Sequence, residues 1–301
     1  MPALVDHMAR LGGVATRSEL LEIASRTAIA RALADGSVHR PRRGRYVLPQ
    51  AEQSLRVAHE LSAVVALRSA ALTHGWKVRT VPERPEVIVP RVRKVRDESR
   101  GRATLRRAAL EPHEVERGVT SPLRTVVDCA RHLPFDEALS VADSALRSGL
   151  LRPTDLMRAG AHIQGAGRMR VLRVLHNAHR KAANPFESSL RAIALDVQGL
   201  AVVPQVGVRL AGGERVAPDL VDATLGLVLE ADSHEFHTGR ARLKSDCWRY
   251  DELVVAGWRV LRFTWEQVMF EQVWVRSVLE RVVALLTHRT HKPLDGLTPQ
   301  A

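Results

Sequence analysis

Three carboxylates between residues 217 and 237 are the side chains of this chain best placed to do chemistry. Asp219 lies in the apolar segment V-A-P-D-L-V, and Glu230 closes the apolar run L-G-L-V-L. Asp232 follows Glu230 by two residues, so on a β-strand the two side chains share a face. Hard oxygen ligands at the end of a sheet suit Mg²⁺ or Mn²⁺, and such a metal can polarise a phosphodiester and activate a water.

Two short apolar segments must place these acids side by side. A turn around Ala223 and Thr224 would fold the chain into a β-hairpin and bring Asp219 beside Glu230. For each acid taken singly, the alternative is a solvated charge at a strand edge or a turn residue. The set favours a site, because buried acids without a metal or a partner are unfavourable.

The wider pattern around these acids resembles a known nuclease fold. P-D, ten intervening residues and then E-x-D resembles the core of PD-(D/E)XK nucleases. His237, the segment D-C-W-R-Y with Asp246 and Arg249, and the segment A-G-W-R-V-L-R-F-T-W look like the small domains related to very-short-patch-repair endonucleases. The resemblance covers residues 183–286. It implies a restriction-endonuclease-like core with a mixed sheet flanked by helices, a Mg²⁺ or Mn²⁺ cofactor, and hydrolysis of DNA.

That fold also takes an acid from an upstream helix. Pro185 suits an early helical position, and the apolar residues that follow recur at helical spacing, which places Glu187 in the first turn. The alternative for Glu187 is an ordinary acid favoured there by the helix dipole. The resemblance implies that Asp219, Glu230 and Glu187 hold the metal and that Asp232 assists.

The chain departs from the nuclease motif at one position. The motif has Lys two residues after its second acid, where this chain has Asp232. That Lys would orient the attacking water and stabilise developing charge. We expect a stand-in: His237 as general base, whose ordinary pKa suits proton transfer near neutrality, or Lys244 or Arg249 as the cation beside the phosphate. Without a stand-in the domain would bind nucleic acid and cut nothing.

The first 50 residues predict a winged helix-turn-helix. Thr16 and Glu19 form a capping-box pattern at the second helix, and Ser25 opens a third helix that Gly36 ends. In this fold the third helix enters the major groove and the basic hairpin that follows contacts phosphates. We expect Arg26 and Arg31 on the helix, and Arg40, Arg42, Arg43 and Arg45 on the hairpin around Gly44, to bind double-stranded DNA.

The same segment resembles a second family. L-G-G-V-A-T-R-S-E-L followed by G-R-Y-V-L-P is similar to the N-terminal domain of AbiEi-type antitoxins, which act as DNA-binding repressors. Segments A-L-R-S-A-A-L-T-H-G-W and T-S-P-L-R-T-V-V-D-C-A-R look like those that accompany such domains. The resemblance implies an alternative function, a non-catalytic DNA-binding regulator that uses the nuclease-like fold as a scaffold.

The intervening residues predict an α+β region without a motif for chemistry. We expect a helix over 54–73, a strand at P-E-V-I-V-P leading into a basic hairpin with R-A-T-L-R-R, helical structure over 120–147, and two helices around the turn at 165–167. His74 fits a helix cap or the core. The predicted domains are 1–50, 51–182 and 183–288, followed by a flexible tail at 289–301.

Composition bounds the function classes. The chain has 45 Lys and Arg against 33 Asp and Glu, a formal net charge of +12, which indicates a polyanionic partner, nucleic acid first. The two cysteines, Cys129 and Cys247, form no C-x-x-C pair, which disfavours a zinc site and fits buried thiols in a reducing cytoplasm. There is no signal-peptide segment and no long apolar run, so we expect no membrane span. A homodimer stays open, as does a toxin partner under the regulator alternative.

Overall fold

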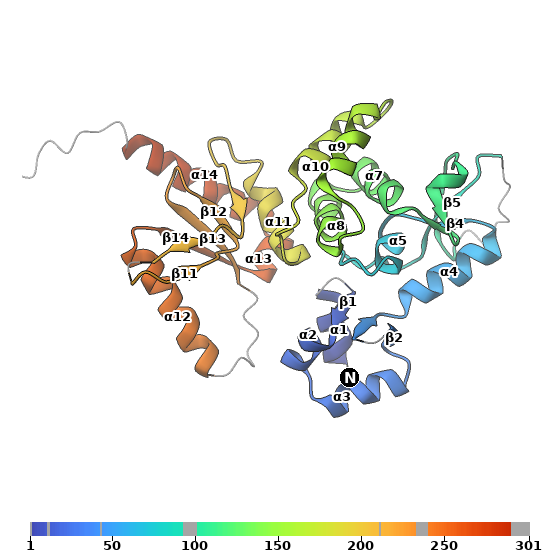
Figure 1. Ribbon diagram of the computed structural model, residues 1–301, viewed down its shortest axis with the longest axis horizontal. Coiled ribbons are helices and arrows are strands. Elements are labelled where there is room, and N and C mark those ends of the chain that lie inside the picture. The colour runs from blue at the N-terminus through green and yellow to red at the C-terminus, as the bar shows by residue number, and fades with distance from the viewer. Residues whose placement is uncertain are drawn as a thin grey trace, which may run out of the picture. The chain divides into compact units, whose positions relative to one another are not determined.

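The computed structural model describes residues 2–10, 13–42, 44–92, 101–210, 212–232 and 240–289, and these ranges combine helices with several sheets (Figure 1). The chain splits into two compact units, residues 1–188 and 189–301. The mixture of helices and sheets agrees with the predicted α+β class. The finer division at residues 50 and 182 stays a prediction, and the tail at 290–301 lies outside the described residues.

The N-terminal segment has three helices followed by a β-hairpin, as predicted, and a short strand between the first two helices that was not predicted. Its elements are α1 (Pro2–Arg10), β1 (Val14–Thr16), α2 (Arg17–Ile23), α3 (Arg26–Ala34), β2 (His39–Arg42) and β3 (Arg45–Val47). The capping box is present, since the Thr16 hydroxyl accepts the N–H of Glu19 and the Glu19 carboxylate accepts the N–H of Thr16. Ser25 caps α3, and Gly44 takes a left-handed conformation with φ 75° at the hairpin tip. An ion pair of 2.6 Å from Glu19 to Lys77 joins this segment to the rest of the first unit.

The rest of the first unit is a five-stranded sheet with helices packed around it. The sheet has the order β6-β5-β4-β8-β7. Its elements are α4 (Gln50–Leu61), β4 (Val64–Val65), α5 (Leu67–Thr73), β5 (Glu86–Val89), β6 (Thr104–Arg107), η1 (Pro112–Glu114), β7 (Val115–Glu116), β8 (Val119–Thr120), α7 (Pro122–His132), α8 (Phe135–Ser148), α9 (Pro153–His162) and α10 (Arg168–Asn177). The helices α9 and α10 flank the glycine-containing turn at 165–167, as predicted.

Two of the predictions for this region were wrong. The helix expected over 54–73 is two helices, because Ser62 is left-handed (φ 45°) and the β-branched pair Val64–Val65 joins the sheet. The helical structure predicted over 120–147 is present as two helices, with Pro134 at the N-cap position of the second. The strands expected to form a basic hairpin are parallel, with Glu86 opposite Thr104, since the chain between them is long enough to cross over.

The histidine and cysteine predictions had mixed outcomes. His74 is the C-cap residue of α5 and its ring lies 2.8 Å from the carbonyl oxygen of Thr120, which confirms the structural role. Cys129 is buried, as expected. Cys247 is exposed, because it lies on the side of its helix that faces away from the sheet.

The second unit is built on a four-stranded mixed sheet with the order β14-β13-β12-β9. Its elements are α11 (Pro185–Ala194), which crosses the division between the units, β9 (Val203–Pro204), β10 (Val208–Arg209), β11 (Arg215–Val216), β12 (Leu220–Asp222), β13 (Leu227–Asp232), α12 (Arg240–Val255), β14 (Arg259–Thr264), α13 (Trp265–Phe270) and α14 (Gln272–Arg289). The strands β13 and β14 are parallel, whereas β12 is antiparallel to both of its neighbours.

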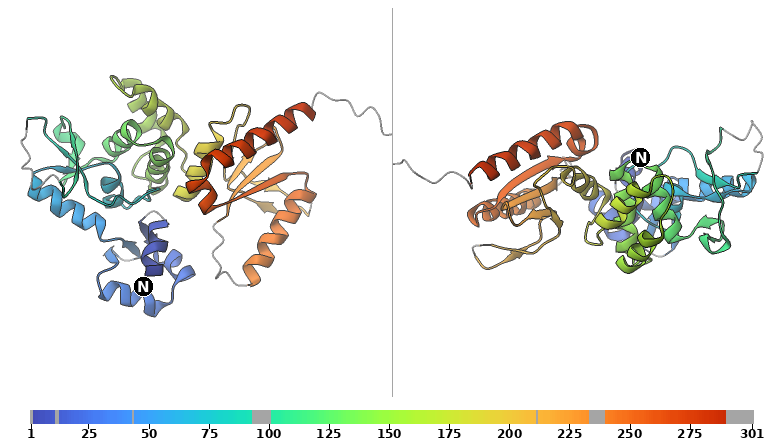
Figure 2. Two further views of the ribbon diagram at one scale, coloured as in Figure 1. Left: turned by 180° about the vertical axis from the view of Figure 1, so that it is seen from behind. Right: turned by 90° about the horizontal axis from the view of Figure 1, so that it is seen from above.

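Helices cover both faces of this sheet. Leu253 of α12 packs with Val221 and Val228 on one face. On the other, Phe263 of β14 meets Trp274 of α14 edge-on, with ring centroids 6.2 Å apart. Figure 2 shows α12 and α14 on opposite sides of the sheet. Among the described residues no helix is long and apolar enough to cross a membrane.

Candidate active site

The predicted hairpin positions the acid pair. In the β12–β13 pairing Leu220 lies opposite Leu229, so the next positions, Asp219 and Glu230, also face each other. The Oδ2 atom of Asp219 accepts the N–H of Ala231 at 2.9 Å, and its Oδ1 atom accepts the side-chain amide of Gln205 at 3.2 Å. Both acids lie on the sheet face that α12 covers, since they alternate in step with Val221 and Val228.

Asp222 builds the turn that makes this pairing. Its buried carboxylate accepts the N–H groups of Thr224 and Leu225, both at 2.9 Å, and that of Ala201 at 2.7 Å. Three amide donors on one carboxylate fix the end of β12, as an Asx turn does. The turn therefore sets the register that places Asp219 beside Glu230.

Glu230 is the strongly perturbed group of the site. Its residue is 2% exposed, and its Oε1 atom is buried with no hydrogen-bond partner among the described residues. Burial and the charge of Asp219 raise the pKa of Glu230 to about 8, while Arg249 opposes this shift. Burial also raises the pKa of Asp219, although the Ala231 N–H lowers it. A proton on one acid, or a cation between them, would supply the missing partner.

The helix α12 brings a cation to the pair. Arg249 Nη2 lies 3.4 Å from Glu230 Oε2 and donates to the Tyr250 hydroxyl at 3.1 Å. The Arg249 Nε atom is buried and has no hydrogen-bond partner in the described part of the chain. Of the residues expected to replace the motif Lys, Arg249 is the one that lies beside the acids in the described chain. It pairs with Glu230 and not with Asp246, its neighbour on the helix.

Asp232 is held by an arginine of the neighbouring strand. It forms an ion pair with Arg262, whose guanidinium lies over the Tyr250 ring at 4.1 Å from the centroid. In the parallel pairing Arg262 lies opposite Glu230, one step from Asp232 along the shared face. The site therefore contains three acids, two arginines and a tyrosine from β13, β14, α12 and the residue directly before β12.

The remaining predicted residues are not part of this cluster in the described chain. Glu187 accepts the N–H of Ala183 and the side-chain amide of Asn184, both at 2.9 Å, as an acid at a helix start does. Lys244 is exposed on α12. His237 lies outside the described residues. Within the described ranges no group of three or more His, Cys, Asp and Glu side chains is arranged to hold a metal ion.

The predicted DNA-binding arginines lie on the expected elements. Arg26 and Arg31 are exposed on α3, and Arg40 is exposed on β2. Arg42 and Arg45 occupy the strand ends at the hairpin tip, but their side chains, like the whole of Arg43, lie outside what the structure describes.

Three contributing residues were missed from the sequence as site residues. Gln205 is far upstream and carries no motif. Tyr250 lies in the quoted segment D-C-W-R-Y without an assigned role, and Arg262 was included in a strand interpreted as core. Arg262 is exposed on its strand, so a search for buried charges would not have found it.

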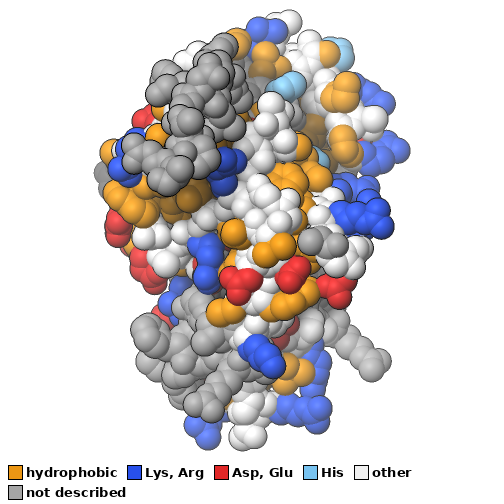
Figure 3. All heavy atoms as spheres, turned by 90° about the vertical axis from the view of Figure 1, so that its left-hand side faces the viewer, with side chains coloured by type: hydrophobic (Ala, Val, Ile, Leu, Met, Phe, Trp, Pro, Cys, Tyr) orange, Lys and Arg blue, Asp and Glu red, His pale blue; other side chains and the backbone are white. Residues whose placement is uncertain are grey.

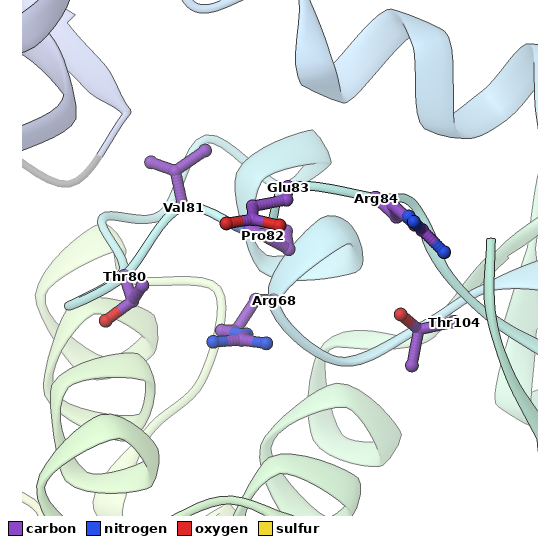
Figure 4. A pocket seen from close by; sticks show the side chains of 7 residues that line it. All are labelled: Arg68, Thr80, Val81, Pro82, Glu83, Arg84 and Thr104. Carbon is purple, nitrogen blue, oxygen red and sulfur yellow. The ribbon is translucent and has the colours of Figure 1, made fainter. Parts of the chain in front are cut away.

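A separate cavity of about 430 Å³ lies in the first unit. Figure 4 shows its lining side chains, which come from α5, the loop at 80–84 and β6. Arg68 projects into it but is already bound to Glu86 at 2.7 Å and to Glu137 at 2.8 Å. The charge of Arg68 is therefore compensated within the protein.

Comparison with known proteins assigns no function to the chain. No family model matches the chain. The uncharacterized proteins MT2308 of Mycobacterium tuberculosis (strain CDC 1551 / Oshkosh) and Rv2248 of Mycobacterium tuberculosis (strain ATCC 25618 / H37Rv) are each 30% identical to it over 154 residues, which is 50% of this chain and 56% of each relative. The chain thus spans about half the length of these relatives. The crystal structure of RV2827C protein from Mycobacterium tuberculosis has a TM-score of 0.32 at 15% identity, covering 69% of this chain and 87% of that one.

Proposed function

We propose that the protein is a metal-dependent DNA endonuclease that hydrolyses phosphodiester bonds at the Asp219–Glu230 pair. The observation that carries the proposal is the buried Oε1 atom of Glu230, which has no hydrogen-bond partner among the described residues and lies beside a second carboxyl group. An acid pair in this state is unfavourable when both groups are ionised. A divalent cation would balance both charges and satisfy that oxygen.

The donor set fits Mg²⁺ or Mn²⁺, which prefer carboxylate oxygens. Asp219 and Glu230 would hold the ion, with Asp232 nearby, while Glu187 as a further ligand stays a prediction. When bound, the ion polarises a phosphodiester and lowers the pKa of a water. The two-acid hairpin followed by a parallel strand supports a PD-(D/E)XK-like core for this unit.

The protein side chains would position the DNA and the water. Arg249 is close enough to Glu230 to neutralise a phosphate bound at the pair, which is the task of the absent motif Lys. Tyr250 and the Asp232–Arg262 ion pair hold the two guanidinium groups in place. His237 is proposed as the proton acceptor on its residue type alone.

The N-terminal segment would bind duplex DNA as a winged helix. Three helices followed by a β-hairpin, with exposed Arg26 and Arg31 on the third helix, support this role. Phosphate contacts give affinity that falls with salt, and contacts to base edges give specificity.

Cleavage of supercoiled plasmid tests the proposal. Wild-type protein should nick the plasmid only with Mg²⁺ or Mn²⁺, and Asp219→Ala should abolish nicking while duplex binding is retained. If Asp219→Ala cuts as well as wild type, the acid pair is not the active site.

A second candidate is the DNA-binding regulator of the AbiEi type. The observation that favours it is the ion pairing of Glu230 with Arg249 and of Asp232 with Arg262, because these arginines already neutralise acids that a metal would use. Retained salt-sensitive duplex binding without cleavage, and without any effect of Mg²⁺ on the melting temperature, would favour the regulator.

A further inference from the structure

The first unit carries a group of positive charges that the proposed function does not use. We call it the arginine patch and define it as Arg106 of β6, Arg131 and His132 at the end of α7, and Arg170 of α10. The helices α7 and α10 pack against each other, and β6 is the edge strand of the five-stranded sheet. The patch therefore draws on elements that lie far apart in the sequence.

The arginines of the patch lack acidic ion-pair partners in the described ranges, and Asp128, which attracts Arg131 electrostatically, is paired with Arg124. No ion pair joins Arg106, Arg131 or Arg170 to an acid among the residues that the structure describes. The sequence contains no Asp or Glu between Asp155 and Glu187, so α10 and its flanking loops cannot supply one. The nearby Arg124 differs, because Glu114 and Asp128 bind it at 2.7 and 2.8 Å.

The arginines of the patch differ in exposure, since Arg170 is exposed whereas Arg106 and Arg131 are partly buried. Arg131 donates to the carbonyl oxygens of Gln164 and Ala166, which fix the guanidinium without cancelling its charge. The Nε atom of Arg106 is buried and has no hydrogen-bond partner in the described ranges. Arg106 is partly exposed and has further N–H groups, to which an external acceptor could bind.

The pKa of His132 is sensitive to the positive charges of the patch. Its pKa is lowered first by burial and then by Arg106, Arg131, Arg124 and Arg170, in that order. These groups come from β6, α7 and α10, and all of them are cations. The patch is thus a local concentration of positive charge, unlike the face of the second unit in Figure 3, where basic, acidic and apolar side chains are interspersed.

We propose that the arginine patch is a second DNA-binding surface of the protein and binds the phosphodiester backbone of duplex DNA. Guanidinium groups recognise phosphate oxygens in a bidentate way, and a row of such groups matches the closely spaced charges of a duplex. The proposal rests on DNA as the substrate of the proposed nuclease. It adds a contact outside both the N-terminal helices and the acid pair, which would hold the duplex during cleavage.

Binding of a fluorescent duplex tests the proposal, with the full-length Asp219→Ala chain in EDTA so that no cleavage interferes. The test variant adds Arg106→Ala and Arg170→Ala. The matched control adds Arg56→Ala and Arg158→Ala, which remove two exposed arginines from α4 and α9. Anisotropy is recorded over a range of salt concentrations. The test variant should bind roughly tenfold more weakly, with a salt slope lower by about 2, whereas the control should keep both values.

Equal losses in both variants, or no loss in either, would overturn the proposal. Arginine-dependent binding of poly-glutamate without duplex binding would also overturn it and assign the patch to an acidic protein. Photo-crosslinks from the duplex should map to the peptides that contain Arg106 and Arg170. The two proposals can fail separately. If duplex binding depends on the patch but the wild type never cleaves DNA, only the nuclease proposal is refuted. If the wild type cleaves DNA but the test and control variants bind duplex equally well, only the patch proposal is refuted.

Discussion

Asp219 and Glu230 face each other across a hairpin, and burial, together with the charge of Asp219, raises the pKa of Glu230 to about 8. A carboxyl group with this pKa keeps its proton at neutral pH unless a cation replaces it. In the metal-free protein the two carboxyl groups would repel each other if both were ionised. Binding of a divalent cation would remove this repulsion.

The first prediction concerns stability against pH. The ordinary pKa of Glu230 is 4.5 and its folded value is about 8, so between these values the folded chain holds a proton that the unfolded chain releases. The free energy of unfolding therefore falls as pH rises through this window. Glu230→Gln should remove this part of the slope, and metal-free Glu230→Gln should be the more stable protein at pH 8, by an amount on the order of a few kcal/mol.

Chemical denaturation of both proteins at several pH values measures this difference. The difference between the two chains isolates the Asp219–Glu230 pair, since other buried acids such as Asp128 and Glu137 are common to both. Parallel pH profiles for wild type and Glu230→Gln would show that Glu230 has an ordinary pKa.

The second prediction is stabilisation by metal. Mg²⁺ or Mn²⁺ should raise the melting temperature of the wild type at pH 8. When the ion is at 100 times its dissociation constant, the free energy of unfolding should rise by about 2.7 kcal/mol. The effect should weaken at pH 6, because protons compete for the acid pair. Asp219→Asn should show no such shift in a thermal melt, and Asp196→Asn, which changes an exposed ion pair with Arg276, should behave like wild type. An identical shift in all three proteins would place the metal elsewhere.

The third prediction separates the two roles of Arg249. Arg249→Ala leaves Glu230 without its cation, so the pKa of Glu230 should rise further. Cleavage should fall by about 10²-fold if Arg249 also neutralises the phosphate. Arg249→Lys keeps the charge but loses the contact geometry to Tyr250, and it should recover part of the cleavage rate. Loss of stability with an unchanged rate per folded molecule would leave Arg249 a purely structural role.

The fourth prediction is independent of function. Asp222→Ala should destabilise the second unit by about 2–4 kcal/mol, because three backbone N–H groups lose their acceptor. Asp222→Asn should recover part of this, since one amide oxygen can still accept. The melting temperature of each variant provides the measurement, and an Asp222→Ala chain as stable as wild type would show that the turn forms without its carboxylate.

Local sequence patterns predicted the hairpin of the acid pair and two helix starts in the N-terminal segment. The alternation and turn residues around Ala223 predicted the hairpin, and the capping residues Thr16 and Ser25 marked helix starts that the structure has. These signals are local, because a cap or a turn depends on a few neighbouring residues.

Long-range pairing could not be obtained in this way. Apolar residues in 54–73 have helical spacing, yet Val64 and Val65 join a sheet whose other strands lie far along the chain. In the site, Arg249 and Arg262 reach the acids only because α12 and β14 return to β13. Spacing within one segment carries no information about which distant segment will pack against it, so the ion pair of Arg249 with Glu230 could not be predicted from spacing, and the role of His237 stays a prediction.

The most direct test of the acid pair is the initial rate of supercoiled-plasmid nicking as a function of Mg²⁺ concentration, for wild type and Glu230→Gln. Glu230→Gln preserves shape and removes the charge that would hold the ion. We predict a saturable dependence on Mg²⁺ for wild type and no nicking by Glu230→Gln at any concentration. Nicking by wild type in EDTA, or equal rates for the two proteins, would contradict the assignment of this pair as a metal-dependent nuclease site.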